Sequence, residues 1–256
     1  MKSRSSTLRL LLAAAILLGS CEQVVSLLRA DDVKKSATAT PSPKFDKDGK
    51  TPQPAFVKSH EAFIEIAKKG DVDVLFLGDS ITAGWRGAGK DVWAKHFEPL
   101  KAANFGIGGD RTQHVLWRIL NGELDGIKPK VAVLMIGTNN SGADPAADIA
   151  EGVTEIVKTI HKKSPATKVL LLAVFPRGKE IPNTQNDKLI EVNKTLAKLD
   201  DGGKTVRYLD IGSKFIGEDK QLPKDIMPDS LHLSPKGYEI WAEAVVPAVK
   251  ELLGKK

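Results

Sequence analysis

The chain has 256 residues, of which 41% are hydrophobic and 27% are charged, and its formal net charge is +6. This length suits one domain with one sizeable core, and no second set of periodic segments predicts another domain. The lysines that make the net charge positive lie at the chain ends and on predicted helix faces, and no aromatic residues interleave with them. This distribution disfavours a nucleic-acid-binding surface.

The amino terminus has the pattern of an export signal. Lys2, Arg4 and Arg9 precede the apolar stretch from Leu10 to Leu18. That stretch is too short to span a bilayer as a stable helix. We therefore predict a signal peptide over residues 1–20.

Cys21 is the only cysteine of the sequence, and it follows Leu18-Gly19-Ser20. This segment resembles the bacterial lipobox, in which the cysteine becomes the lipidated first residue of the mature protein. The sequence thus predicts a periplasmic or cell-envelope lipoprotein attached to a membrane through Cys21. One alternative is an ordinary signal sequence cut near Ala30, which would give a secreted protein, and another is an uncleaved anchor. In each case a single cysteine leaves the exported domain without an internal disulfide.

Residues 21–54 are expected to form a disordered tether. From Ala30 to Pro54 the chain consists mainly of Lys, Asp, Ser, Thr and Pro, with hardly a large apolar residue. Such a composition predicts that the segment cannot bury enough surface to fold. The folded domain is therefore expected to cover residues 55–256.

The rest of the chain alternates short apolar runs with segments of helical period. The predicted strands are Val74 to Leu77, about Ala103 to Phe105, Val131 to Ile136, Val169 to Phe175 and Val206 to Ile211. The predicted helices are Phe56 to Lys69, Arg111 to Asn121, Asp148 to Lys163, Asn186 to Leu199 and Ser234 to Leu253, the last with Ser234 as N-cap and Pro235 as its first residue. Strands that are apolar on both faces and alternate with amphipathic helices predict an α/β fold, a three-layer α/β/α domain around a parallel sheet of about five strands.

Ser80 is the candidate nucleophile. The tripeptide Gly78-Asp79-Ser80 directly follows the first predicted strand, so Ser80 is expected at the carboxyl edge of the sheet, where open α/β sheets bind ligands. The alternative is that Asp79 and Ser80 merely cap the next helix. Attack of a serine on an ester also requires a base, a group that orients the base, and donors for the oxyanion.

His232 is the candidate base, and Asp229 is the carboxylate that would orient it. Pro228 before them and Ser234-Pro235 after them indicate a loop, which can bring the carboxylate against the imidazole. An Asp and a His three residues apart are usually surface residues, but this pair stands between the last strand and the last helix. Of the other histidines, His60 and His161 are expected to be solvated, His96 lies in a polar segment, and His114 is expected to be a packed or hydrogen-bonded helix residue.

The candidate oxyanion donors are the backbone N–H groups of Ser80 and Gly109 and the side-chain amide of Asn139. Each lies in a block that follows or contains a predicted strand. Gly108 is the alternative to Gly109. Both glycines could instead serve a tight turn, and Asn139 could be a turn-forming asparagine. Thr138 and Asn140 are expected to support the loop.

Other residues give weaker signals. Trp85 and Trp93 flank the loop after Ser80, where either could wall an acyl pocket, and Arg177 either faces the substrate or is a surface loop charge. The glycine turn at residues 106–109 lacks the third glycine of a dinucleotide fingerprint. No His, Cys or carboxylate cluster suggests a metal, so neither a metal nor another cofactor is expected.

Together these blocks resemble the SGNH or GDSL hydrolase family over residues 74–247. The stretch from Asn104 to Arg118 is particularly similar to the platelet-activating-factor acetylhydrolase branch, and Gly137-Thr138-Asn139-Asn140 and Pro176-Arg177-Gly178 extend the similarity. The resemblance implies a flavodoxin-like sheet, an open site without a cofactor, and hydrolysis of acyl esters. It also implies that Ser80, Gly109, Asn139 and His232 are the family's four named residues and that Asp229 completes the triad.

The sequence therefore predicts a serine esterase that cleaves short acyl esters, above all acetyl esters, through an acyl-enzyme. A carbohydrate O-acetylesterase with the same mechanism is one alternative, and a catalytically silent glycan-binding protein of the envelope is another. The expected partners are small acyl esters or acetylated glycans, and a homodimer is an open alternative for assembly. The Gly-x-Ser-x-Gly elbow of classical lipases is absent, with Thr82 in place of its last glycine.

Overall fold

The computed structural model describes residues 35–255 of the chain. The predicted signal peptide over residues 1–20, Cys21 and the first part of the predicted tether lie outside the described residues. Ser36–Lys256 form one compact unit. Among the helices of the described part, none is both long enough and apolar enough to cross a membrane.

Five parallel strands form one sheet in the order β2-β1-β3-β4-β5. The strands are β1 (Val74–Gly78), β2 (Ala102–Gly106), β3 (Val131–Met135), β4 (Lys168–Leu172) and β5 (Val206–Leu209). This order is that of a flavodoxin-like doubly wound sheet, with its reversal between β1 and β3. The predicted parallel α/β sheet is confirmed. Strands β4 and β5 end before the predicted Phe175 and Ile211, because their pairing with each other stops at Leu172 and Leu209.

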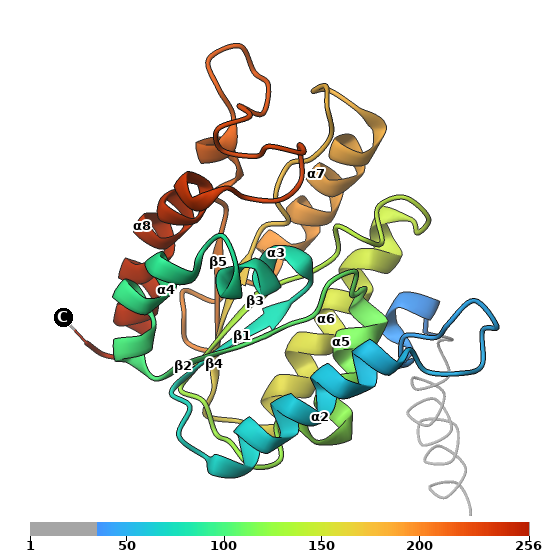
Figure 1. The fold of residues 1–256 in the computed structure, drawn as a ribbon, viewed down its shortest axis with the longest axis vertical. Coiled ribbons are helices and arrows are strands. Elements are labelled where there is room, and N and C mark those ends of the chain that lie inside the picture. Colours follow the sequence, from blue (N-terminus) through green and yellow to red (C-terminus); the bar gives the residue numbers. More distant parts are fainter. Residues whose placement is uncertain (1–34, 256) are drawn as a thin grey trace, which may run out of the picture. The chain divides into compact units, whose positions relative to one another are not determined.

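Helices cover both faces of the sheet (Figure 1). The α-helices are α2 (Pro54–Lys69), α3 (Ser80–Ala83), α4 (Lys90–His96), α5 (Thr112–Arg118), α6 (Ala146–Lys163), α7 (Thr184–Leu196) and α8 (Pro235–Leu252). Short helical turns are η1 (Ala37–Ala39), η2 (Gly84–Arg86), η3 (Glu98–Leu100), η4 (Ile119–Glu123), η5 (Ala197–Leu199) and η6 (Gly212–Phe215). One apolar cluster joins the sheet to α2, α5, α6 and α7, and a second cluster joins it to α3, α4 and α8. As predicted, Ser234 caps α8 and Pro235 begins it.

Strand β1 shows why the sheet is buried on both faces. Leu75 and Leu77 belong to the first apolar cluster, whereas Val74 and Phe76 belong to the second. Side chains alternate between the faces of a strand, so an uninterrupted apolar run supplies both clusters. Burial of each such side chain stabilises the fold by about 1.5–3 kcal/mol. This burial fixes the position of the strand end that precedes Ser80.

The two tryptophans after Ser80 lie in an aromatic cluster of the core. Trp85 is 1% exposed, and its ring centroid lies 4.5 Å from that of Tyr238 and 4.9 Å from that of Trp241. Trp93 is half-buried and packs against Phe76 at 5.0 Å. The hypothesis that Trp85 walls an acyl pocket is therefore wrong, because its ring is already enclosed by the core. Trp93 uses its ring for the same aromatic packing.

Residues 36–53 pack on the domain, which differs from the expected tether. We call this segment the N-terminal strap. Its Thr38 is 1% exposed, and the Thr38 carbonyl accepts a hydrogen bond of 2.9 Å from the hydroxyl of Thr112. The Ser42 N–H donates to the Gln113 carbonyl at 3.2 Å. In Figure 1 the strap, in blue, lies beside α5 and α6. The expectation of disorder over 36–54 failed because it considered large apolar side chains only, whereas the strap is held by hydrogen bonds and small buried residues.

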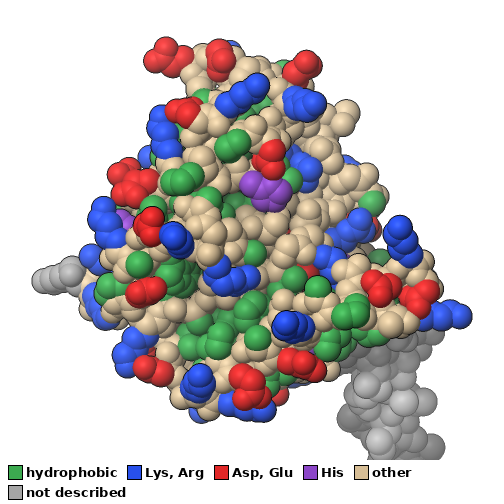
Figure 2. Space-filling view, viewed as in Figure 1, with side chains coloured by type: hydrophobic (Ala, Val, Ile, Leu, Met, Phe, Trp, Pro, Cys, Tyr) green, Lys and Arg blue, Asp and Glu red, His purple; other side chains and the backbone are tan. Residues whose placement is uncertain are grey.

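Charged side chains of both signs are interspersed over the face of the molecule drawn in Figure 2. The described part of the chain contains exposed ion pairs, such as Lys95 with Glu239 at 3.3 Å and Lys236 with Asp225 at 2.6 Å. Such pairs contribute little to stability, since water screens them. The basic side chains on this face are therefore spread out rather than gathered in one band.

Candidate active site

Ser80 lies where β1 meets α3, at the carboxyl edge of the sheet. Asp79 is the N-cap of α3, and its carboxylate accepts the Ile81 N–H at 3.0 Å. Asp79 thus caps the turn, as the alternative interpretation proposed, while the Ser80 hydroxyl remains available for other contacts. The turn packs closely on β2, because a Cβ on Gly106 would stand 2.4 Å from the Ala83 nitrogen. Glycine at position 106 therefore lets α3 sit where it presents Ser80.

Ser80, His232 and Asp229 form a continuous chain of hydrogen bonds. The Nε2 atom of His232 lies 2.9 Å from the Ser80 Oγ, and its Nδ1 lies 2.6 Å from the Asp229 Oδ2. Ser80 and His232 are separated by 152 positions in the sequence. A nucleophile, a base and an orienting carboxylate in this sequence of contacts have the geometry of an activated serine.

The loop that carries Asp229 and His232 is fixed by its own backbone. The Asp229 Oδ1 accepts the N–H groups of Leu231 at 3.0 Å and His232 at 2.7 Å, and Ser230 adopts a positive φ of 62° between them. Met227 and Leu233, on either side, are buried in the core. The imidazole is therefore held by a tight turn that is anchored at both ends.

The carboxyl group of Asp229 is held in its charged form. Partial burial alone would raise its pKa, but the hydrogen bonds from the ring and the backbone of His232 outweigh that effect and keep the pKa below the ordinary value. A charged Asp229 accepts a proton-bearing Nδ1, which leaves Nε2 to face Ser80 as the acceptor nitrogen. This is the tautomer that a base requires.

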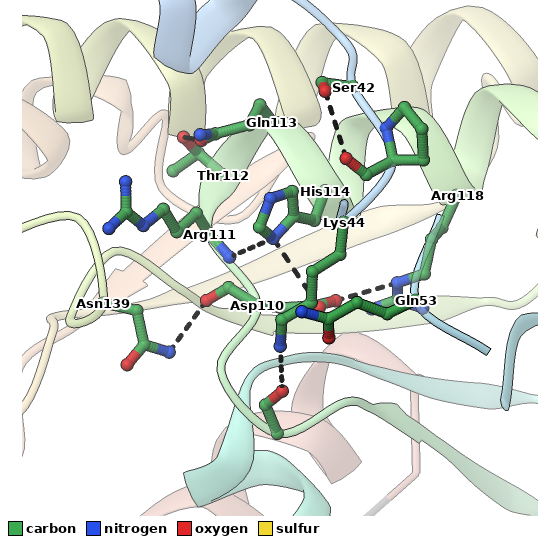
Figure 3. A network of polar contacts seen from close by, with 12 residues as sticks. Ser42, Lys44, Gln53, Asp110, Arg111, Thr112, Gln113, His114, Arg118 and Asn139 are labelled. Carbon is green, nitrogen blue, oxygen red and sulfur yellow. Dashed lines mark hydrogen bonds and ion pairs between the residues drawn. The ribbon is translucent and has the colours of Figure 1, made fainter. Parts of the chain in front are cut away.

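The loop that contains Gly109 lies close to Ser80, and Asn139 is hydrogen-bonded to the same loop. A Cβ on Gly108 would stand 4.0 Å from the Ser80 Cβ, and Gly109 adopts a positive φ of 73°, which favours glycine. The Nδ2 atom of Asn139 donates to the Asp110 carbonyl at 2.8 Å (Figure 3). An amide nitrogen carries two hydrogens, so the second one remains available. The structure thus brings the segment of residues 106–110, which we call the glycine loop, to Ser80 and ties Asn139 to that loop through Asp110.

The residues on either side of Asn139 hold its loop in place, as expected. The Asn140 Oδ1 accepts the Thr112 N–H at 3.1 Å, and its Nδ2 donates to Asp144 at 2.8 Å. The Nη1 atom of Arg177 donates to the carbonyl of Thr138 at 2.9 Å and to its hydroxyl at 3.1 Å. Arg177 is therefore more than a surface loop charge, because it fixes the segment that carries Asn139.

A buried ionic network supports the glycine loop, and the sequence did not reveal it. Arg118 is 0% exposed and donates to Asp110 at 2.9 Å and to the Phe105 carbonyl at 3.0 Å. It also pairs with Glu123, which lies 2.9 Å from the Nδ1 of His60. The expectation that His60 is solvated is wrong, since His60 is 6% exposed and bonded to Glu123. In the sequence these charged residues look like ordinary exposed side chains, and no local pattern shows that they meet.

Asp110 joins this network to the candidate site. Its burial raises the pKa of its carboxyl group to about 6, against the opposing effect of Arg118 and Lys44. Its carbonyl oxygen is the acceptor for Asn139. Through Asp110, the buried charges therefore fix both the glycine loop and the amide of Asn139.

The remaining histidines are at least half-buried. The Nδ1 of His114 accepts the Arg111 N–H at 3.1 Å, and burial lowers the pKa of His114 to about 3. His114 is thus a packed and hydrogen-bonded helix residue, as expected. His96 is half-buried and lies 3.9 Å from Glu239. His161 is half-buried as well, so it is less solvated than expected. Across residues 35–255, no three His, Cys, Asp or Glu side chains gather as metal ligands would.

Substitution of Asp79 by Asn tests the burial of this carboxyl group. Burial raises the pKa of Asp79 to about 7, although the Ile81 N–H, His232 and Arg177 act in the opposite direction. A folded-state pKa above the unfolded value of about 3.9 makes the folded wild-type protein lose stability as the pH rises from about 4 to about 7. Relative to the wild type, Asp79→Asn should therefore become more stable over this interval, by roughly a few kcal/mol at pH 8.

The free energy of unfolding, measured with urea at a series of pH values, checks this expectation. Asparagine keeps an oxygen for the Ile81 N–H, so the cap is conserved. Asp225→Asn is a suitable control, because the pKa of the exposed Asp225 is lowered by its hydrogen bond to Lys236. Its difference in stability from the wild type should therefore change only below about pH 4 and stay constant from pH 4 to 8. A constant difference between wild type and Asp79→Asn from pH 4 to 8 would show that Asp79 titrates normally.

Known proteins are similar to this chain in sequence and in fold. Residues 76–240 match the family model described as GDSL-like Lipase/Acylhydrolase family. The chain is 38% identical over 198 residues to platelet-activating factor acetylhydrolase IB subunit alpha2 of Rattus norvegicus, which covers 77% of this chain and 85% of the relative. It is 34% identical over 222 residues to subunit alpha1 of the human enzyme, over 87% of this chain and 93% of the relative.

Solved structures have the same fold at lower identity. A GDSL-like lipase from Bacteroides thetaiotaomicron superposes with a TM-score of 0.58 at 20% identity, over 75% of this chain and 97% of that one. A catalytic mutant of an acetylxylan esterase from Geobacillus stearothermophilus superposes with a TM-score of 0.55 at 16% identity, over 74% of this chain and 97% of that one. The chain therefore belongs to the GDSL-like lipase/acylhydrolase family. As a member of that family it is a carboxylic ester hydrolase.

Proposed function

We propose that this esterase hydrolyses short acyl esters, above all acetyl esters, with Ser80 as nucleophile. The observation that carries the proposal is the chain of contacts from Ser80 Oγ to His232 Nε2 at 2.9 Å and from His232 Nδ1 to Asp229 at 2.6 Å. No cofactor is needed for this chemistry, since each proton transfer has a side chain to perform it.

In the acylation step, the Ser80 oxygen attacks the ester carbonyl while His232 Nε2 takes the hydroxyl proton. The carbonyl oxygen becomes negatively charged and accepts hydrogen bonds from the N–H groups of Ser80 and Gly109 and from the free N–H of Asn139. The tetrahedral intermediate then expels the alcohol, which receives the proton from His232. Asp229 stabilises the imidazolium meanwhile and keeps its own charge.

In the second step, water resolves the acyl-enzyme. His232 takes a proton from the water as its oxygen attacks the acyl carbonyl, and the same donors receive the second oxyanion. Collapse of this intermediate returns the proton to Ser80 and releases the carboxylic acid. The two steps reuse one base and one set of donors, so a single fixed geometry serves both.

A short acyl group is favoured by the relatives and by the packing around Ser80. The curated relatives at 38% and 34% identity are named as acetylhydrolase subunits. Trp85 and Trp93, which could have lined a pocket for a longer chain, pack in the aromatic cluster of the core instead. Both observations support a small acyl group.

The predicted export signal favours an acetylated glycan as the natural substrate, which gives a second candidate with the same mechanism. A polysaccharide needs an open site, and Gly108, Gly109 and Asp229 are exposed beside Ser80. Removal of O-acetyl groups from a carbohydrate would use the same attack by Ser80. The two candidates therefore differ only in the alcohol that carries the acyl group.

The experiment that tests the proposal compares p-nitrophenyl acetate, butyrate and octanoate, with the full chain and its Ser80→Ala variant. We expect kcat/KM to fall as the acyl chain lengthens and hydrolysis by the variant to be lost except for a small residual rate. Acetylated xylo-oligosaccharides and an acetylated phospholipid then distinguish the two alcohol classes. A folded wild-type protein that binds acetylated glycans without hydrolysing any ester would contradict the proposal and indicate a silent binding protein.

A further inference from the structure

Lys44 brings a positive charge to the glycine loop from outside the matched family region. It lies in the N-terminal strap, 32 residues before residue 76, where that match begins. Its Nζ atom donates to the Gly108 carbonyl at 2.6 Å (Figure 3). A Cβ on Gly109 would stand 2.6 Å from the same nitrogen, so the ammonium group lies directly over Gly109.

The acceptor of this hydrogen bond belongs to the peptide unit that carries the candidate oxyanion donor. The carbonyl of Gly108 and the N–H of Gly109 are joined by one amide bond, whose electrons are delocalised over both groups. A cation that draws electron density to the carbonyl oxygen makes the N–H a stronger donor. Hydrogen bonds that share a polarised group strengthen each other by about 10–30% per bond.

The strap holds Lys44 in this position. The Lys44 carbonyl accepts the Gln53 N–H at 2.7 Å, and Phe45 pairs with Pro52 as an antiparallel bridge. Two residues earlier, the Ser42 N–H is bonded to Gln113 in α5. The lysine backbone is therefore tied both to its own hairpin and to the helix that follows the glycine loop. Such a contact costs less backbone entropy than one made by a lysine on a free tether, because the backbone is already ordered.

We propose that Lys44 is a positioning residue for catalysis, which polarises the Gly108–Gly109 peptide and fixes the Gly109 N–H toward the oxyanion. This inference rests on the proposed function, because it assumes that Gly109 receives the oxyanion. The contribution belongs to the transition state, when charge has developed on the carbonyl oxygen. The strap thereby becomes part of the enzyme, although its composition resembles that of a linker.

Lys44→Met tests the proposal, because methionine has nearly the same length and lacks both the charge and the donor. We expect kcat for p-nitrophenyl acetate to fall about 5- to 20-fold with little change in KM, a part of the roughly 100- to 1000-fold loss that follows removal of a whole oxyanion donor. Lys44→Arg should keep most of the activity, since a guanidinium can still donate to Gly108. Lys47→Met is the matched control in the same strap, where Lys47 is exposed, and it should behave as the wild type.

A thionoester separates polarisation from a general disturbance of the site. Sulfur is a weak hydrogen-bond acceptor, so p-nitrophenyl thionoacetate gains less from the oxyanion donors than the oxygen ester does. The ratio of kcat for ester to kcat for thionoester should therefore fall in Lys44→Met. Equal losses of kcat on both substrates in Lys44→Met would overturn the proposal. So would an unchanged kcat in Lys44→Met that equals the kcat of Lys44→Arg.

The amide proton of Gly109 provides a readout that does not depend on turnover. In the ¹H–¹⁵N spectrum this resonance should move upfield in Lys44→Met and stay near its wild-type position in Lys44→Arg. A shift without any esterase activity in the wild type would contradict the proposed function and leave the polarised peptide as a structural feature. Wild-type activity together with an unmoved Gly109 resonance and an unchanged kcat would contradict the role of Lys44 alone.

Discussion

Ser80→Ala should lower kcat by about 10⁵- to 10⁶-fold, because it removes the atom that forms the acyl-enzyme in the proposed mechanism. The alanine variant keeps the oxyanion donors, so residual hydrolysis over the uncatalysed rate is expected from those donors alone. Ser80 is half-buried and its hydroxyl is hydrogen-bonded to the half-buried His232, so its removal leaves no fully buried group without a partner. Steady-state hydrolysis of p-nitrophenyl acetate and the melting temperature, measured on the same preparations, check the two parts of the expectation.

A double variant that combines Ser80→Ala with His232→Ala tests more strictly whether the two residues act together in catalysis. If Ser80 and His232 act as one unit, the double variant should be no slower than Ser80→Ala. Ser59→Ala is a control in α2, where the Ser59 hydroxyl is bonded to the carbonyl of Ala55 in its own helix. Independent and additive losses would mean that the two residues are not one catalytic unit. Retained acyl transfer in Ser80→Ala would assign the nucleophile to another residue.

Asn139→Ala should lower kcat by about 100- to 1000-fold and leave KM nearly unchanged. The amide is fixed before any charge appears, because one of its hydrogens is bonded to Asp110 at 2.8 Å. A donor that is already in place needs no reorganisation when the oxyanion forms, which is why its loss affects kcat. Kinetics with p-nitrophenyl acetate under saturating conditions measure the effect.

The same substitution also breaks the contact with Asp110, so its structural effect needs a control. Asn140→Ala removes hydrogen bonds to Thr112 and Asp144 from the neighbouring position. We expect Asn140→Ala to lower the melting temperature more than Asn139→Ala and kcat less. A large rise in KM with unchanged kcat in Asn139→Ala would make Asn139 a substrate-binding residue and leave the oxyanion to the backbone donors.

The position of the site follows from the order of the strands. Ser80 follows β1 and Asn139 follows β3, the two strands between which the chain reverses its direction across the sheet. Loops that leave adjacent strands on either side of this reversal diverge, which opens space at the carboxyl edge. The glycine loop after β2 and the loop of His232 reach the same space. Rigid strands thus fix the origin of each loop, and the loops supply the chemistry.

The local pattern of the sequence was sufficient for the fold and for the choice of candidate residues. Short apolar runs, such as Val74 to Leu77, predicted the strands, and the alternation with helices predicted the parallel sheet. Ser234 and Pro235 predicted the start of the last helix, because the cap and the first-position proline both act within its first turn. In each case the determining interactions lie within a few residues of one another.

Only the tertiary structure decided which distant side chains are partners. Nothing near His60 in the sequence indicates that Glu123 and Arg118 are its neighbours, and nothing near Lys44 indicates the carbonyl of Gly108. Composition predicted that the strap is disordered. That prediction was wrong because the strap is held by hydrogen bonds to α5 and α6, which lie far along the chain and leave no mark in its own composition. Periodicity records which face of an element is apolar. It does not record what lies opposite, since that depends on how elements distant in sequence pack together.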